Sequence, residues 1–162
     1  MQLAQLNIAE GVVAMDDPQM QPFTGRIDAI NALADRTDGF IWRLTDDDAD
    51  IDGALSLRLP GDDTTLVNMS VWDSVEALFS FVYKTAHAKV MTDNRENFVD
   101  MPKQHFVLWW VEDGHIPPLT EAKARLDDLR DNGPNPHAFT FAMPFSAEGQ
   151  PITPSFPKKD CA

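Results

Sequence analysis

The apolar and polar residues of this chain alternate between the spacing typical of β-strands and that typical of α-helices. Strand residues point to opposite faces in turn, whereas helix residues three and four apart share a face. By these periods we predict strands over residues 3–8, 40–44, 66–72 and 105–112. We predict helices over about 20–36, from Val75 onward, and between a cap at Thr120 and a stop at Gly133, with a short strand at 138–142.

The central part of the chain, Leu66 to Phe98, predicts a strand that runs directly into a helix. Ser74 follows the apolar strand and belongs to the residue types preferred at a helix N-cap. The apolar stripe of the helix is formed at three- and four-residue steps by Val75, Leu78, Phe79 and Val82. Tyr83, His87 and Met91 continue at four-residue steps, so we expect a hydroxyl and an imidazole to share one helix edge.

The predicted order of strands and helices is that of a split β-α-β unit, which forms an antiparallel sheet with helices on one face, the ferredoxin-like arrangement. The fold class is therefore α+β, with an extra C-terminal helix and a short strand. Both faces of the sheet carry large apolar residues, among them Phe40, Trp42, Trp109 and Trp110. The face without helices needs another cover, and a second copy of the chain is the simplest one. We therefore expect a homodimer.

Size and charge narrow the class of protein. The 162 residues suit one domain, which we place at 1–143, followed by a tail at 144–162. The formal net charge of −13 argues against nucleic acids and anionic membranes as partners. No apolar run approaches the ~18 residues of a membrane span, and the N-terminus lacks the basic and apolar regions of a signal peptide. These features predict a cytoplasmic protein.

An acidic segment from Asp46 to Asp52 resembles the opening of a calcium-binding EF-hand loop, because acids alternate before Gly53. That loop needs a bidentate glutamate six residues beyond the glycine, and Leu59 stands there. The flanks are predicted as strand and loop, where an EF-hand has two helices. We therefore expect a solvated loop that does not bind calcium tightly.

Three separated motifs carry a resemblance to a known family. They are GFIWRL at 39–44, VNMSVWDSVEALFSFVYKTAH at 67–87 and HFVLWWVEDGHIPPLTEAKARLDDLRDNGPNPHAFTF at 105–141. With these motifs the chain resembles the bacterial domain-of-unknown-function family 3291 from Leu3 to Phe141. The segment at 91–98, MTDNRENF, is poorer in arginine than is usual for that family.

The resemblance implies a dimeric α/β barrel, within a superfamily of antibiotic-biosynthesis monooxygenases, haem-degrading monooxygenases, small polyketide cyclases and stress-response proteins. Haem-degrading members carry an Asn on the first strand and an axial His at the end of the central helix, and Asn7 and His87 occupy similar places. Ala77 stands near the position of their helical Trp. This departure argues against the haem-degrading reaction and leaves haem as a cofactor of His87 open.

His87 and Tyr83 are the candidate catalytic residues, His87 as a general base or haem ligand and Tyr83 as a residue that orients a substrate oxygen. Their alternative is structural, with the imidazole packed against the phenol ring. No other metal site is predicted, because the remaining histidines have unsuitable spacing.

Asn7, Asn68 and Ser70 lie on strands that neighbour each other in a ferredoxin-like sheet. They are candidate substrate-binding residues, together with Trp72 and Trp42. Alternatively, the polar residues satisfy one another, and the tryptophans belong to the core or the dimer interface.

Two functional hypotheses follow. The first is a monooxygenase- or cyclase-like enzyme that acts on a small apolar or aromatic molecule in a pocket between helices and sheet. The second is a non-catalytic dimer that binds a ligand or takes part in a stress response. The enzyme predicts a polar cluster at the end of a cavity, whereas the second hypothesis predicts that His87 and Tyr83 are packed without a void.

Overall fold

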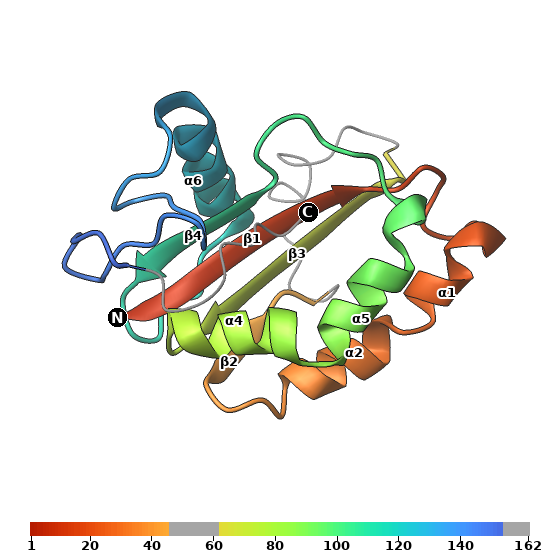
Figure 1. Cartoon of the computed structure of the whole chain (residues 1–162), viewed down its shortest axis with the longest axis horizontal. Coiled ribbons are helices and arrows are strands. Elements are labelled where there is room, and N and C mark those ends of the chain that lie inside the picture. Colours follow the sequence, from red (N-terminus) through yellow and green to blue (C-terminus); the bar gives the residue numbers. More distant parts are fainter. Residues whose placement is uncertain (46–61, 154–162) are drawn as a thin grey trace.

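The computed structural model of the chain describes residues 1–45 and 62–153. These residues form an antiparallel sheet with the strand order β2-β3-β1-β4 (Figure 1). The strands are β1 Gln2–Glu10, β2 Phe40–Arg43, β3 Thr65–Trp72 and β4 Phe106–Val111. The α-helices are α1 Gln21–Thr24, α2 Ile27–Ala34, α4 Val75–Lys84, α5 Ala86–Asp93 and α6 Leu119–Asn132, and the 3-10 helices are η1 Pro18–Met20 and η2 Arg95–Asn97.

This strand order and the alternation of strands with helices are those of a ferredoxin-like α+β fold, so the predicted fold class is confirmed. All four predicted main strands are present, with ends that differ by one or two residues. The acidic segment at 46–52 and the last residues of the predicted tail, 154–162, lie outside the described residues. In the part of the chain that is described, no helix is long and apolar enough to cross a membrane. The cytoplasmic location stays a prediction.

One face of the sheet is covered by helices α2 and α4. Its buried core contains Leu3, Trp72 and Leu108 from the strands and Leu78, Phe79 and Phe81 from α4. Trp72 contacts Phe40 and Phe81 through ring centroids 5.3 Å and 5.1 Å apart. Beyond this core, Val90 of α5 packs with Met20, Phe23 and Leu66. We call this surface the α4 face.

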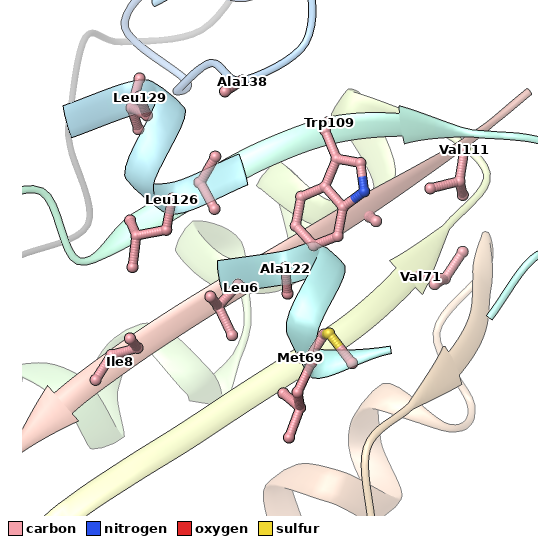
Figure 2. Packing of buried hydrophobic residues seen from close by; sticks show 13 residues of the cluster. Leu6, Ile8, Met69, Val71, Trp109, Val111, Ala122, Leu126, Leu129 and Ala138 are labelled. Carbon is pink, nitrogen blue, oxygen red and sulfur yellow. The ribbon is translucent and has the colours of Figure 1, made fainter. Parts of the chain in front are cut away.

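The opposite face, which we call the α6 face, is covered by α6, and this corrects the expectation that helices lie on one face alone. Figure 2 shows Ala122, Leu126 and Leu129 of this helix among the buried side chains of the sheet. The strands contribute Leu6, Ile8, Met69, Val71, Val107, Trp109 and Val111. Because α6 packs here, much of the apolar surface that predicted a homodimer is buried within one chain.

The central helix was predicted to continue past His87, and this prediction is wrong. The helix ends at Lys84, and a new helix begins at Ala86, because Thr85 adopts an extended backbone with φ −112° and ψ −174°. The Thr85 hydroxyl donates to the Phe81 carbonyl over 2.6 Å and accepts from the His87 backbone N–H over 3.2 Å. One side chain therefore caps both helices at the break.

Other helix boundaries are partly as predicted. Ser74 accepts from the Ala77 N–H as an N-cap, and Gly133 ends α6 with φ +73°. The helix at 20–36 is wrong as a single element, because it divides into η1, α1 and α2. Pro118, not Thr120, is the N-cap of α6. The strand predicted at 138–142 is reduced to isolated bridges, one of which pairs Phe139 with Leu108 of β4.

Gly39 directly precedes β2 and has φ +86°, and its carbonyl accepts a hydrogen bond from the backbone N–H of Asp73, just after β3, over 2.8 Å. A Cβ atom there would lie 2.5 Å from the Asp73 Oδ1 atom. We expect Gly39→Ala to lower the free energy of unfolding by more than the ~1–2 kcal/mol of left-handed backbone strain, because the side chain also collides. Gly114→Ala is the control, since Gly114 has φ +81° but open space around it. Equal losses in urea denaturation would contradict the collision.

Candidate functional site

Four side chains on the α4 face of the sheet form a continuous row of hydrogen bonds, which we call the polar row. The Trp72 indole Nε1 donates to Ser70 Oγ over 2.8 Å. The amide nitrogen of Gln5 lies 2.9 Å from Ser70 Oγ and 2.6 Å from Asn68 Oδ1. Gln5, Ser70 and Trp72 are buried, whereas Asn68 is exposed. The row therefore begins in the core and ends at the surface.

The pairing of β1 with β3 places these residues together. Gln5 lies opposite Ser70, and Asn7 lies opposite Asn68. Residues directly opposite in antiparallel strands have their Cβ atoms about 4.5–5.5 Å apart on the same face. Asn7 is half-buried, and its side chain makes no hydrogen bond within the described residues. The predicted polar residues of the two strands thus meet at the exposed end of the polar row.

His87 lies at the break between α4 and α5 and contacts the polar row only through other rings. Its ring centroid is 5.1 Å from that of Phe81, which in turn is 5.1 Å from Trp72. The His87 Nδ1 atom lies 3.2 Å from the Val82 carbonyl, which selects the tautomer with the proton on Nδ1. Burial lowers the pKa of His87, and the bond to Val82 opposes this shift in part. The imidazole is therefore held neutral.

Tyr83 lies on another side of α4 and is not a neighbour of His87 in the way predicted. Its ring contacts Phe79 at 4.5 Å and Phe141 at 5.9 Å. Phe79 and Phe81 are two residues apart, so on a helix they project in roughly opposite directions. Tyr83 packs on Phe79, and His87 packs on Phe81. The helix break at Thr85 removes the shared edge that four-residue spacing predicted.

Trp42 also lies apart from the other predicted site residues. Its partners are the apolar residues of the α6 face, whereas Trp72 belongs to the α4 face. A register shift between Phe40 and Trp42 accompanies this placement in β2. The structure therefore brings Asn7, Asn68, Ser70 and Trp72 together and leaves out Trp42.

The surroundings of His87 do not fit a haem ligand. Neither of two hollows on the described surface is lined by His87, Tyr83 or the polar row. One, of about 520 Å³, is lined by Thr92, Asp93, Arg95, Glu96, Phe98 and Asp100. The other, of about 250 Å³, is lined by Arg26, Ala29, Ile30, Ala86, Lys89 and Val90. Haem needs a large apolar slot beside its axial imidazole, and His87 instead packs on Phe81.

A second polar cluster lies on the α6 face, and sequence analysis missed it. The buried Trp109 indole donates to Glu121 Oε1 over 3.0 Å, and His115 Nε2 lies 2.8 Å from Glu121 Oε2. Glu121 stands in the first turn of α6, where a negative charge is favourable. This cluster satisfies a core tryptophan and ties the loop after β4 to α6. Among the described residues no group of three or more His, Cys, Asp or Glu side chains could hold a metal ion.

Gln5 is the other residue that sequence analysis missed, although it is the centre of the polar row. It precedes Asn7 by two positions on β1, and strand alternation therefore places both on one face. That alternation was the available signal.

A family model described as "Domain of unknown function (DUF3291)" matches residues 2–154. No curated protein matches the sequence. Among solved structures, the chain is similar to SnoaB, a cofactor-independent oxygenase from Streptomyces nogalater, with 16% identity, a TM-score of 0.48, and coverage of 72% of this chain and 97% of that one. It is also similar to a proposed antibiotic biosynthesis monooxygenase from Chloroflexus aurantiacus, with 14% identity, a TM-score of 0.42, and coverage of 72% and 98%.

The lowered pKa of His87 predicts a pH dependence of stability. Between the folded pKa and the ordinary value of 6.5, the unfolded chain binds the proton more readily than the folded one. This contribution to stability is present above pH 6.5 and is lost as the pH falls below it. We expect His87→Gln to lose less stability than wild type between about pH 7 and about pH 5 in urea denaturation. Parallel curves for the two proteins would show that the pKa is not lowered.

Proposed function

This chain belongs to the domain-of-unknown-function family DUF3291, and we propose that it binds a small, largely apolar or aromatic molecule at the exposed end of the polar row. The observation that supports this function is the row itself, which joins two buried polar side chains to the exposed Asn68. Small-molecule sites typically combine apolar walls with a few placed polar groups. Asn7 and Asn68 supply amide groups there, and Trp72 and Phe106 supply aromatic neighbours on the same face.

The finer proposal is a monooxygenase- or cyclase-like reaction of the bound molecule. Amide N–H groups in a site that excludes water stabilise an enolate or phenolate oxygen, and such anions are the reactive forms of electron-rich substrates. The neutral His87 suits a general base, because a neutral imidazole accepts a proton. Phe81 and Trp72 connect His87 to the polar row by ring contacts. A base role therefore requires that the substrate extend past these rings toward the helix break.

The alternative is a non-catalytic ligand-binding protein, and a specific observation favours it. Both candidate catalytic side chains are packed against aromatic rings, Tyr83 on Phe79 and His87 on Phe81. Neither Tyr83 nor His87 lines the hollow beside Arg95 or the hollow between α2 and α5. In this alternative the polar row binds a molecule and releases it without chemical change. Oxygen consumption or product formation with a bound molecule distinguishes the two functions.

We also propose that the protein forms a homodimer. On the α6 face, Trp42, Leu44 and Val67 are half-buried hydrophobic residues at the β2 and β3 side of the sheet. Helix α6 packs chiefly against β4 and β1, which leaves that side as the contact surface for a second copy. Sedimentation at micromolar concentration measures the oligomeric state, and a monomer would contradict the proposal.

We predict that 2-naphthol binds at the polar row. This probe is flat and apolar, and its hydroxyl both donates and accepts hydrogen bonds. In ¹⁵N-labelled protein it should shift the signals of the Trp72 indole and the Asn68 amide. Asn68→Ala should weaken binding on the order of tenfold. It should lower the free energy of unfolding by only about 1 kcal/mol, because Asn68 is exposed and loses one hydrogen bond.

The matched control is Asn31→Ala on α2, whose side chain makes no hydrogen bond within the described residues. It should bind 2-naphthol as wild type does. Undiminished binding to Asn68→Ala, or signal shifts confined to other parts of the protein, would contradict the proposed function.

A further inference from the structure

Helices α2 and α5 lie side by side (Figure 1), and a hollow of about 250 Å³ opens between them. Each helix contributes a cation, an alanine and a branched aliphatic residue to its lining. The three members of each set are spaced so that they share one helix face. They are Arg26, Ala29 and Ile30 on the side of α2, and Ala86, Lys89 and Val90 on the side of α5. The hollow is therefore formed by two matching helix faces.

The deepest part of this hollow is apolar. Val90 is buried and Ile30 is half-buried, and both belong to the hydrophobic cluster around Met20. Ala29 and Ala86 are exposed, and their single methyl groups are too short to cover the aliphatic residues between them. The volume lies below the ~300–1,000 Å³ of sites for drug-sized molecules, so the occupant that fits is compact and largely apolar.

Arg26 and Lys89 add positive charge to this apolar hollow. Lys89 Nζ lies 2.8 Å from Asp93 Oδ2, and Arg26 Nη1 lies 3.5 Å from the same oxygen. Two cations thus share one carboxylate, and among the described residues no acidic side chain lines the hollow itself. This local excess of positive charge is unusual in a chain with a net charge of −13. It favours a ligand that carries a negative charge.

The two cations have hydrogen-bond donors to spare. Within the described residues Arg26 makes one side-chain hydrogen bond, the long one to Asp93. A guanidinium group carries further N–H donors in a planar fork that matches a carboxylate. The hydrogen bond from Lys89, aided by Arg26, lowers the pKa of Asp93, so the Asp93 carboxylate is charged at neutral pH. A carboxylate from a ligand would meet the same donors that Asp93 uses.

We propose that the hollow between α2 and α5 binds a compact apolar or aromatic carboxylate. Its apolar body lies on Ile30 and Val90, and its anionic group binds Arg26 and Lys89 in competition with Asp93. A neutral molecule gains the apolar contact alone and binds more weakly. This site lies apart from the polar row, and it does not depend on the function proposed there.

Two probes of similar shape test the selection for an anion. They are sodium 2-naphthoate and its neutral methyl ester, each titrated into protein labelled with ¹³C at the methyl groups of Ala, Ile and Val. We expect naphthoate to shift the signals of Ile30 and Val90 and to bind there on the order of fivefold more tightly than the ester. The advantage should shrink as salt is added, because the cations are exposed.

Asp93→Asn tests the competition. The variant removes the carboxylate that shares the two cations, so naphthoate should bind on the order of threefold more tightly, whereas the affinity for the ester should stay the same. Asp131→Asn is the matched control, because it removes the same charge from α6, on the opposite face of the sheet. It should leave both affinities close to those of wild type.

A filled hollow tests the position of the site. Ala29 and Ala32 are both exposed on α2, but only Ala29 lines the hollow. Leucine is a good helix former, so both leucine variants should fold. Ala29→Leu should abolish the shifts of Ile30 and Val90 caused by naphthoate, and Ala32→Leu should retain them.

Four results would overturn the proposal. They are equal affinities for naphthoate and ester at the hollow, unchanged binding to Asp93→Asn, wild-type binding to Ala29→Leu, and shifts of Ile30 and Val90 that depend on protein concentration without any probe. The last result would show that a second copy of the chain covers the hollow. Naphthoate shifts confined to Trp72 and Asn68 would also overturn this site and would leave the function proposed for the polar row standing.

Discussion

The register between β1 and β3 is the constraint on which the candidate site depends. It sets Gln5 against Ser70, Asn7 against Asn68, and Leu3 against Trp72. Because strand side chains alternate between faces, a slip of one residue would turn these polar groups toward the α6 core and the apolar residues of β1 toward α4. Two buried faces therefore hold the register, and the register in turn holds the polar row together.

The break between α4 and α5 shapes the region above that row. Thr85 ends one helix and begins the next through two hydrogen bonds of its own side chain. As a result, Phe81 packs on Trp72 while Val90 of the next helix packs in a separate cluster with Leu66. Leu66 and Trp72 mark the two ends of β3 on this face, and the exposed Asn68 lies between them. The exposed Asn68 thus lies between the strand residue that packs with α4 and the strand residue that packs with α5.

Much of the fold could be predicted from the sequence, because strand periods, the Ser74 cap and the glycine stops are local signals. The interruption at Thr85 could not, since apolar periodicity continues across it and a threonine is compatible with a helix. Tyr83 and His87 were therefore assigned to one edge, whereas they contact Phe79 and Phe81 respectively. Asn7, Asn68 and Ser70 were found because they are polar residues in apolar strands.

Gln5 and the cover of the second face needed the three-dimensional structure. Gln5 alternates with Asn7, but only pairing with β3 shows that its amide joins Ser70 to Asn68. Helix α6 has the apolar positions of any amphipathic helix, and its sequence does not state against which face of the sheet it packs. Trp42 was placed with Trp72 for a similar reason, since a register shift in β2 is not visible in the pattern.

A crystal structure of the protein with 2-naphthol bound would show whether the polar row is a binding site. We expect the naphthol oxygen within about 3.2 Å of the free amide end of Gln5, with the ring system at the exposed end of the polar row beside Asn7 and Asn68. Naphthol in the hollow between α2 and α5, with the Gln5 amide bonded only within the protein, would contradict it.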